Sequence, residues 1–118
     1  MKKNIILTFF IMLLLIPAIA YSHVGIVDCS PSQDSVVTTP PEKITVNFGG
    51  SIEPAFSKIE VFDPNGDKVS AECRFLEEDS VIESDLQENL SPGVYKVKWK
   101  IMSLDGHAIK GEYNFTIE

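Results

Sequence analysis

Apolar and polar residues alternate along several short segments of the chain, and turn-forming residues separate these segments. In residues 94–101, every second residue is large and apolar: Tyr95, Val97, Trp99 and Ile101. The positions between them hold Lys96, Lys98 and Lys100. Successive side chains of a β-strand point to opposite faces, so this pattern predicts a strand with one buried face and one solvated lysine face.

Similar but weaker patterns predict strands at residues 24–29, 43–48, 57–62, 80–86 and 108–117. Residues 71–79 are acidic and poorly patterned, and there we expect a piece of strand together with a variable loop. Residues 32–41 and 52–56 are rich in turn formers or contain proline, so both are expected to be loops. The Asn65-Gly66 pair within residues 63–67 is typical of a β-hairpin turn. About seven strands with turns roughly every 8–12 residues, and no helical pattern after residue 23, predict an all-β fold, either a β-sandwich or a small Greek-key barrel.

The first 22 residues have a different pattern. Lys2 and Lys3 precede a continuous apolar run that ends near Ala20, as in a secretory signal peptide, and the small residue Ser22 places cleavage just before His23. The run is shorter than the ~20 residues that span a bilayer, which disfavours an uncleaved membrane anchor. We therefore expect a cleaved signal peptide at 1–22 and one exported domain at 23–118, with no stable membrane insertion after cleavage.

Charge and cysteine content narrow the function. Export would remove Lys2 and Lys3, leaving eight basic and seventeen acidic residues and a net charge of −9, which disfavours a nucleic-acid partner. Cys29 and Cys73 are the two cysteines. In an exported protein they predict either a disulfide or two idle thiols, and a soft-metal site for reduced copper is a further alternative.

The candidate chemistry lies near the end of the chain. Asp105 and His107 are two residues apart, a spacing that places both side chains on one face of an extended backbone, and Gly106 between them allows a tight turn. After cleavage, His23 would offer its α-amine and its Nδ1 to one ion. The three residues can therefore form a metal site, whereas the alternative is a frayed terminal histidine and a loop histidine paired with Asp105.

The region after residue 22 resembles the CopC/PcoC family of periplasmic copper-binding proteins. The resemblance is carried by His23 and by segments in a characteristic order: Ser30-Pro31, Pro41 to Ile44 with Asn47-Phe48, Pro54 to Ser57, Pro92 to Tyr95 with Trp99, Ser103 to His107, and Gly111 to Thr116. It implies an immunoglobulin-like, seven-stranded Greek-key β-sandwich or barrel. It also implies a periplasmic Cu(II) site formed by His23, Asp105 and His107.

Two positions depart from the family pattern. Gly50 stands where some members have a glutamate close to the copper, which leaves the outer coordination open, and Glu53 is not assigned to that role. The region 71–83 has no methionine, and Met102 is the only methionine after residue 22, so a thioether Cu(I) site is not expected.

The resemblance implies a copper carrier or buffer in copper homeostasis or resistance, not an enzyme. A CopD-type transporter of the inner membrane is the partner that it suggests. Two alternatives stay open at this point. One is a copper-dependent oxidative enzyme of the histidine-brace type, and the other is a metal-free, immunoglobulin-like interaction domain.

Overall fold

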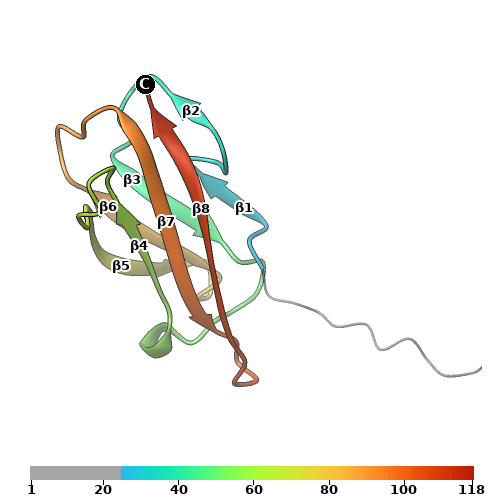
Figure 1. Ribbon diagram of the computed structural model, residues 1–118. Coiled ribbons are helices and arrows are strands. Elements are labelled where there is room, and N and C mark those ends of the chain that lie inside the picture. Colours follow the sequence, from blue (N-terminus) through green and yellow to red (C-terminus); the bar gives the residue numbers. More distant parts are fainter. Residues whose placement is uncertain (1–24) are drawn as a thin grey trace, which may run out of the picture.

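The computed structural model describes residues 25–118 as two packed β-sheets (Figure 1). The elements are β1 (Asp28–Ser30), β2 (Val36–Val37), β3 (Lys43–Asn47), the 3-10 helix η1 (Pro54–Phe56), β4 (Lys58–Phe62), β5 (Ser70–Leu76), β6 (Val81–Leu86), β7 (Gly93–Met102) and β8 (Ala108–Ile117). The signal peptide predicted at 1–22 and the candidate ligand His23 lie outside the described residues.

Each sheet has four strands. The first sheet has the order β1-β3-β6-β5, and its neighbouring strands are antiparallel. The second sheet has the order β2-β8-β7-β4, in which only the β2–β8 pair is parallel. The prediction of an all-β sandwich is confirmed, with eight strands where about seven were expected.

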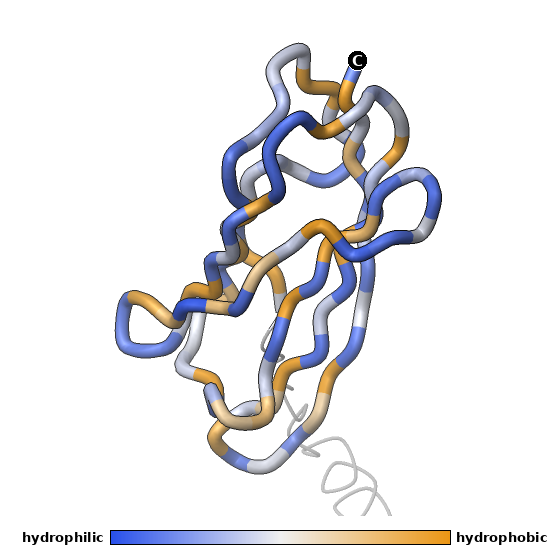
Figure 2. The backbone as a smooth tube through the Cα atoms, turned by 90° about the vertical axis from the view of Figure 1, so that its left-hand side faces the viewer, coloured by the Kyte–Doolittle hydropathy of each residue, from blue (hydrophilic) through white to orange (hydrophobic). Residues whose placement is uncertain are grey.

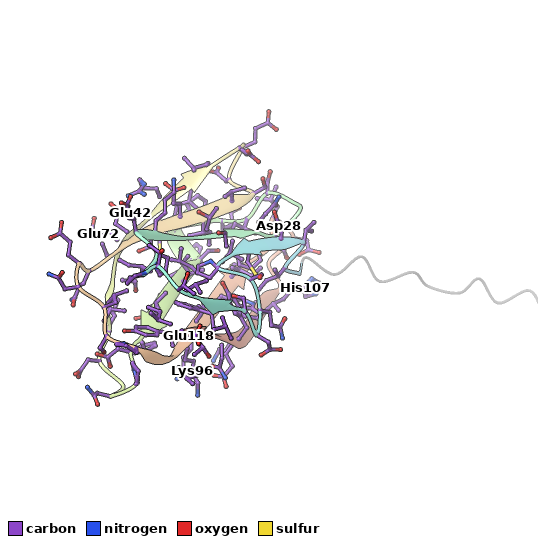
Figure 3. The ribbon with its side chains drawn as sticks, turned by 90° about the horizontal axis from the view of Figure 1, so that it is seen from above. Asp28, Glu42, Glu72, Lys96, His107 and Glu118 are labelled. Atoms are coloured by element: carbon purple, nitrogen blue, oxygen red, sulfur yellow. The ribbon has the colours of Figure 1, made fainter. Side chains whose placement is uncertain are left out.

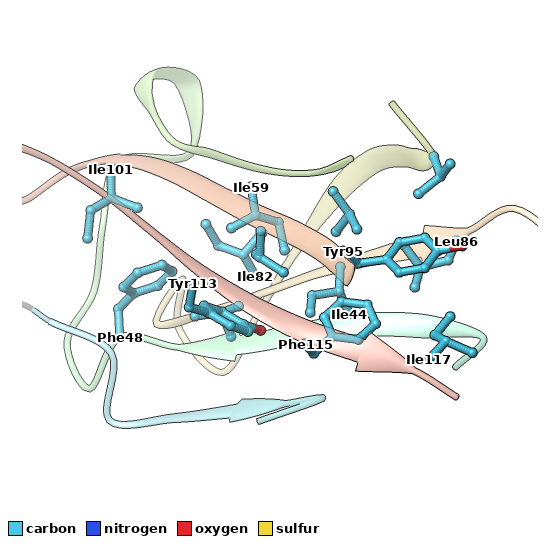
Figure 4. Packing of buried hydrophobic residues seen from close by; sticks show 14 of the residues in the cluster. Ile44, Phe48, Ile59, Ile82, Leu86, Tyr95, Ile101, Tyr113, Phe115 and Ile117 are labelled. Atoms are coloured by element: carbon cyan, nitrogen blue, oxygen red, sulfur yellow. The ribbon is translucent and has the colours of Figure 1, made fainter. Parts of the chain in front are cut away.

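The buried residues come from the alternating positions of both sheets. Figure 2 shows hydrophobic and hydrophilic residues following one another along the strands. The apolar side chains of the buried residues fill the space between the sheets (Figure 4). Tyr95 and Phe115 stack there with ring centroids 5.4 Å apart. Each large apolar side chain buried in this way contributes roughly 1.5–3 kcal/mol to folding.

β7 and β8 form the longest hairpin of the described chain. Their register runs from the Gly93–Ile117 pair to the Met102–Ala108 pair, so the intervening residues 103–107 form the connecting loop. This loop lies at the end of the sandwich opposite the C-terminus, and η1 lies at the same end (Figure 1). The expected alternation along β7 is confirmed: Tyr95, Val97 and Ile101 are fully buried.

Two local predictions need correction. The segment 32–41, expected to be a loop, contains β2, which pairs with the end of β8. The segment 52–56, also expected to be a loop, contains η1. The hairpin turn expected at 63–67 is confirmed, because Phe62 and Lys68 form an antiparallel bridge and the amide of Val69 donates to the carbonyl of Val61 over 2.8 Å. The hairpin ends there, since β4 belongs to the second sheet and β5 to the first. Within residues 25–118, no helix has the length and apolar character needed to cross a membrane.

Candidate metal centre

The loop between β7 and β8 is closed by its own backbone. The amide of Ser103 donates to the carbonyl of His107 over 2.9 Å, and the amide of Gly106 donates to the carbonyl of Ser103 over 3.0 Å. Gly106 has φ of +88°, a left-handed conformation that glycine adopts without a steric penalty. The loop therefore holds Asp105 and His107 in one defined arrangement at the tip of a long hairpin.

Asp105 is the centre of the polar contacts in this loop. Its Oδ1 accepts hydrogen bonds from the Ser103 hydroxyl and, over 3.3 Å, from the amide of His107. The Ser103 hydroxyl, followed by the side chain and amide of His107, lowers the pKa of Asp105 from 3.8 to about 2. The carboxylate is exposed, and with this pKa it is fully ionised at neutral pH.

His107 turns one ring nitrogen towards this carboxylate. Its Nδ1 lies 3.0 Å from Oδ2 of Asp105, and 80 % of its side-chain surface is exposed. In the neutral ring, a proton on Nδ1 that is donated to the carboxylate leaves the lone pair on Nε2, which is the nitrogen free to bind a metal. The structure thus brings together two of the three predicted ligands, as the spacing of Asp105 and His107 indicated.

Sequence reasoning left Ser103 without a role, and the structure gives it one. The side chain is buried at 7 % exposure, and its hydroxyl contacts both Asp105 and the amide of His107, at 3.2 Å from the latter. In the sequence, Ser103 stands two residues before Asp105, and Gly106 follows Asp105. This order is typical of a turn closed by side-chain hydrogen bonds, so the sequence contains a signal for the role of Ser103.

The loop is connected to the start of β1 through the end of β3 and the segment that follows β3. The amide of Val27 donates to the carbonyl of Asn47 over 2.8 Å, and Ile52, five residues later, forms a β-bridge with Ser103. In Figure 3, His107 and Asp28 lie on the side of the molecule where the described chain begins. No group of three or more potential metal-ligating His, Cys, Asp or Glu side chains occurs among residues 25–118.

The two cysteines are not brought together. Cys29 and Cys73 are both free, and they lie in β1 and β5 at opposite edges of the first sheet. Three strand spacings of about 4.8 Å separate these edges by roughly 14 Å, whereas a disulfide needs Cα atoms within about 7 Å. Of the alternatives that the sequence left open, a Cys29–Cys73 disulfide is therefore not formed in this structure, and a soft-metal site shared by both thiols fails for the same reason.

Each cysteine has a separate environment. The Cys73 thiol contacts the backbone of Ile59, with its Sγ 3.4 Å from both the amide nitrogen and the carbonyl oxygen. Cys29 lies beside Tyr113, whose pKa is raised by burial and, to a smaller extent, by this thiol. The two thiols therefore serve as small packing groups in different parts of the sandwich.

The family model described as the CopC domain matches residues 26–118. The chain belongs to the CopC family. Copper resistance protein C of Escherichia coli is 30 % identical over 107 residues, which cover 84 % of this chain and 84 % of that protein. Copper transport protein CutJ of Bacillus subtilis (strain 168) is 32 % identical over 122 residues, covering 99 % of this chain but only 22 % of CutJ.

Solved CopC-family structures share the fold. The crystal structure of CopC from Methylosinus trichosporium OB3b has a TM-score of 0.73 and 35 % identity, covering 81 % of this chain and 94 % of that one. PcoC from Escherichia coli, described as a methionine-rich copper resistance protein, has a TM-score of 0.70 and 28 % identity, covering 82 % and 100 %. In contrast to a methionine-rich protein, this chain has Met102 as the only methionine of its described part.

Two further family-related positions lie near the hairpin. The amide of Glu53 donates to the carbonyl of Met102 over 2.9 Å, which places its backbone at the base of the loop. Gly49, next to Gly50, has φ of +73° and packs closely against Val27. The start of the described chain therefore packs closely against Gly49, and Gly50 stands where a carboxylate was considered.

Proposed function

We propose that this CopC-family protein binds one Cu(II) ion outside the cytoplasm and acts as a carrier or buffer in copper homeostasis and resistance. The observation that carries the proposal is the Asp105–His107 pair, an ionised carboxylate that orients an exposed imidazole and leaves its Nε2 free. Imidazole nitrogen with carboxylate oxygen is a donor set that suits Cu(II).

The remaining donors in this proposal come from His23. As the first residue after cleavage, it would supply its α-amine and Nδ1, and His107 would supply Nε2. Asp105, the third predicted ligand, would supply an oxygen if its carboxylate turns from Nδ1 of His107 towards the ion. β1 belongs to the first sheet and the hairpin to the second, and packed sheets are about 10 Å apart. The four steps from His23 to Val27 span up to about 14 Å in an extended chain, which is enough to cross that gap.

A carrier role is favoured over oxidative catalysis by the placement of the aromatic residues. A histidine-brace oxidase acting on a polymer needs a broad exposed platform around its copper. Tyr95 and Tyr113 are buried, and Trp99 packs against Tyr113 with ring centroids 6.2 Å apart. Tyr95 and Tyr113 are thus committed to the core, and Trp99 is half-buried against it, so the three residues do not form such a platform. This favours binding and release of the ion over chemistry on a substrate.

The proposed location is the periplasm, and the proposed recipient is a CopD-type transporter of the inner membrane. Support comes from CutJ, which is named a copper transport protein and of which this chain matches only 22 %. A domain of this kind is therefore found joined to a much longer chain with a transport name.

A competition titration with a chromogenic Cu(II) chelator tests the ligand assignment. All proteins should begin at His23, and the variants are His107→Gln and Asp105→Asn, with Leu104→Ala as the control. Leu104 is 64 % exposed in the same loop, so its loss should leave the affinity unchanged. Loss of the orienting carboxylate should weaken binding by about 10- to 100-fold, and loss of the imidazole by at least as much. Wild-type affinity in His107→Gln would overturn the proposal.

A further inference from the structure

The outer face of the second sheet carries most of the positive charge of the protein. Inward-facing residues of β4, β7 and β8 are buried in the core, so the alternate positions face outward. We call these positions the lysine face, and its basic residues are Lys58, Lys96, Lys98, Lys100 and Lys110. Residues 25–118 contain eight basic and seventeen acidic residues, yet this face holds five of the former and, among the latter, only Glu60 and Glu112.

The register places three of these lysines directly opposite one another. Lys58 pairs with Lys100 across β4 and β7, and Lys100 pairs with Lys110 across β7 and β8. Like charges at directly opposed positions are unfavourable for sheet stability. Within the described part of the chain, Lys100 and Lys110 form no ion pair, whereas Lys58 shares Glu60 with Lys68.

A second row of outward-facing residues crosses the same three strands beside these lysines, and its charges favour strand pairing. There Lys98 stands between two carboxylates, those of Glu60 and Glu112, and the charges alternate across the three strands. The same sheet therefore has one row with alternating signs and one row with three positive charges. Stability of the sheet accounts for the first row, whereas the second suits a surface that meets negative charge from outside.

Exposed apolar side chains border the lysines at both ends of the face. Phe56 of η1 is 62 % exposed and, with Lys58, Lys100 and Met102, lines a hollow of about 300 Å³. Val94, on the outward side of β7, is 54 % exposed. Lysines bordered by exposed apolar groups are typical of surfaces that lie on a membrane, where ammonium groups meet phosphates and apolar groups enter the interface.

We propose that the lysine face docks on anionic phospholipid headgroups. The hollow of about 440 Å³ among these strands is lined by four exposed lysines and two carboxylates, which are Lys58, Lys98, Lys100, Lys110, Glu60 and Glu112, so the lysines outnumber the carboxylates by two to one. Flexible charges spread over three strands match an extended array of phosphates better than one small anion. The strongly acidic remainder of the surface would face away from the membrane. If the metal site is as proposed above, docking also brings the hairpin close to the lipid, since η1 and the hairpin share one end of the sandwich (Figure 1).

Vesicle co-sedimentation in metal-free buffer with a chelator tests this docking independently of copper. The vesicles contain either phosphatidylcholine alone or equal parts of phosphatidylcholine and phosphatidylglycerol. We expect binding only to the anionic vesicles, weakened by salt. Each lysine near an anionic membrane contributes about 1 kcal/mol, so Lys100→Gln with Lys110→Gln should lower the partition coefficient by about 30-fold.

The matched control removes two charges elsewhere. Lys43→Gln with Arg74→Gln alters exposed residues of the first sheet by the same net charge, and its partition coefficient should change much less. Circular dichroism checks that both doubles are folded. Equal losses in the two doubles, or equal binding to both kinds of vesicle, would overturn the proposal. Binding to soluble polyglutamate without binding to anionic vesicles would assign the face to an acidic protein partner and would also overturn it.

Discussion

Replacement of Ser103 by alanine tests how the loop controls its carboxylate. The Ser103 hydroxyl is the largest of the causes that keep the pKa of Asp105 at about 2 instead of 3.8. In Ser103→Ala that donor is lost, while the side chain and amide of His107 still donate to Asp105. The pKa of Asp105 should therefore rise from about 2 towards 3.8 without reaching it. A carboxyl-carbon NMR titration of the aspartate residues measures this directly.

The same substitution changes stability in a pH-dependent way. Because the pKa of Asp105 is lower in the folded state, its contribution is complete above the ordinary aspartate pKa of about 3.9 and is lost as the pH falls towards 2. In Ser103→Ala this acid-dependent loss should become smaller. At neutral pH, losing the hydrogen bonds of the buried hydroxyl should cost about 0.5–1.5 kcal/mol in the free energy of unfolding, measured by urea denaturation.

Ser57→Ala is the matched control. Ser57 is similarly buried at 8 % exposure, and its Oγ accepts a hydrogen bond from the amide of Met102 over 3.0 Å, close to the hairpin. This variant should lose a similar amount of stability and leave the pKa of Asp105 unchanged. An unchanged pKa of Asp105 in Ser103→Ala, or an equal change in both variants, would refute the role given to the Ser103 hydroxyl.

Two further predictions concern the sandwich itself. A Cβ on Gly111 would clash with Cζ2 of Trp99, so Gly111→Ala should displace the indole and destabilise the protein by about 1–3 kcal/mol in thermal unfolding. Gly25→Ala has open space around it and should have almost no effect. A wild-type melting temperature in Gly111→Ala would contradict this packing. A thiol titration in denaturant without reductant should count two free thiols for Cys29 and Cys73, and a count of zero would contradict the sheet order.

The long strands could be predicted because their alternation extends over ten residues, as in β7 and β8. β2 has only two residues, Val36 and Val37, which is too short for any periodic signal. The Asn65-Gly66 turn was recognised, but turn chemistry does not report which sheet the next strand joins. The amide of Val61 donates to the hydroxyl of Ser70 over 2.9 Å just where the chain leaves the hairpin for the first sheet.

The candidate site shows the same division between local and long-range information. Asp105 and His107 were identifiable because their two-residue spacing is a local property. The loop keeps Oδ2 of Asp105 and Nδ1 of His107 3.0 Å apart. The separation of Cys29 from Cys73 depends on the order of four strands, which no local pattern contains. The lysine row was correctly predicted to face solvent, but the register that opposes Lys58, Lys100 and Lys110 emerges only when three strands pair.

The proposed Cu(II) site needs a free amine on His23 in addition to the hairpin. Its most direct test is the Cu(II) affinity of protein beginning at His23, compared with protein that carries one additional residue before it, measured by competition titration together with the electron paramagnetic resonance spectrum. We expect one tightly bound Cu(II) in the first protein, and a large loss of affinity with an altered spectrum in the second. Equal affinity and identical spectra in the two proteins would contradict it.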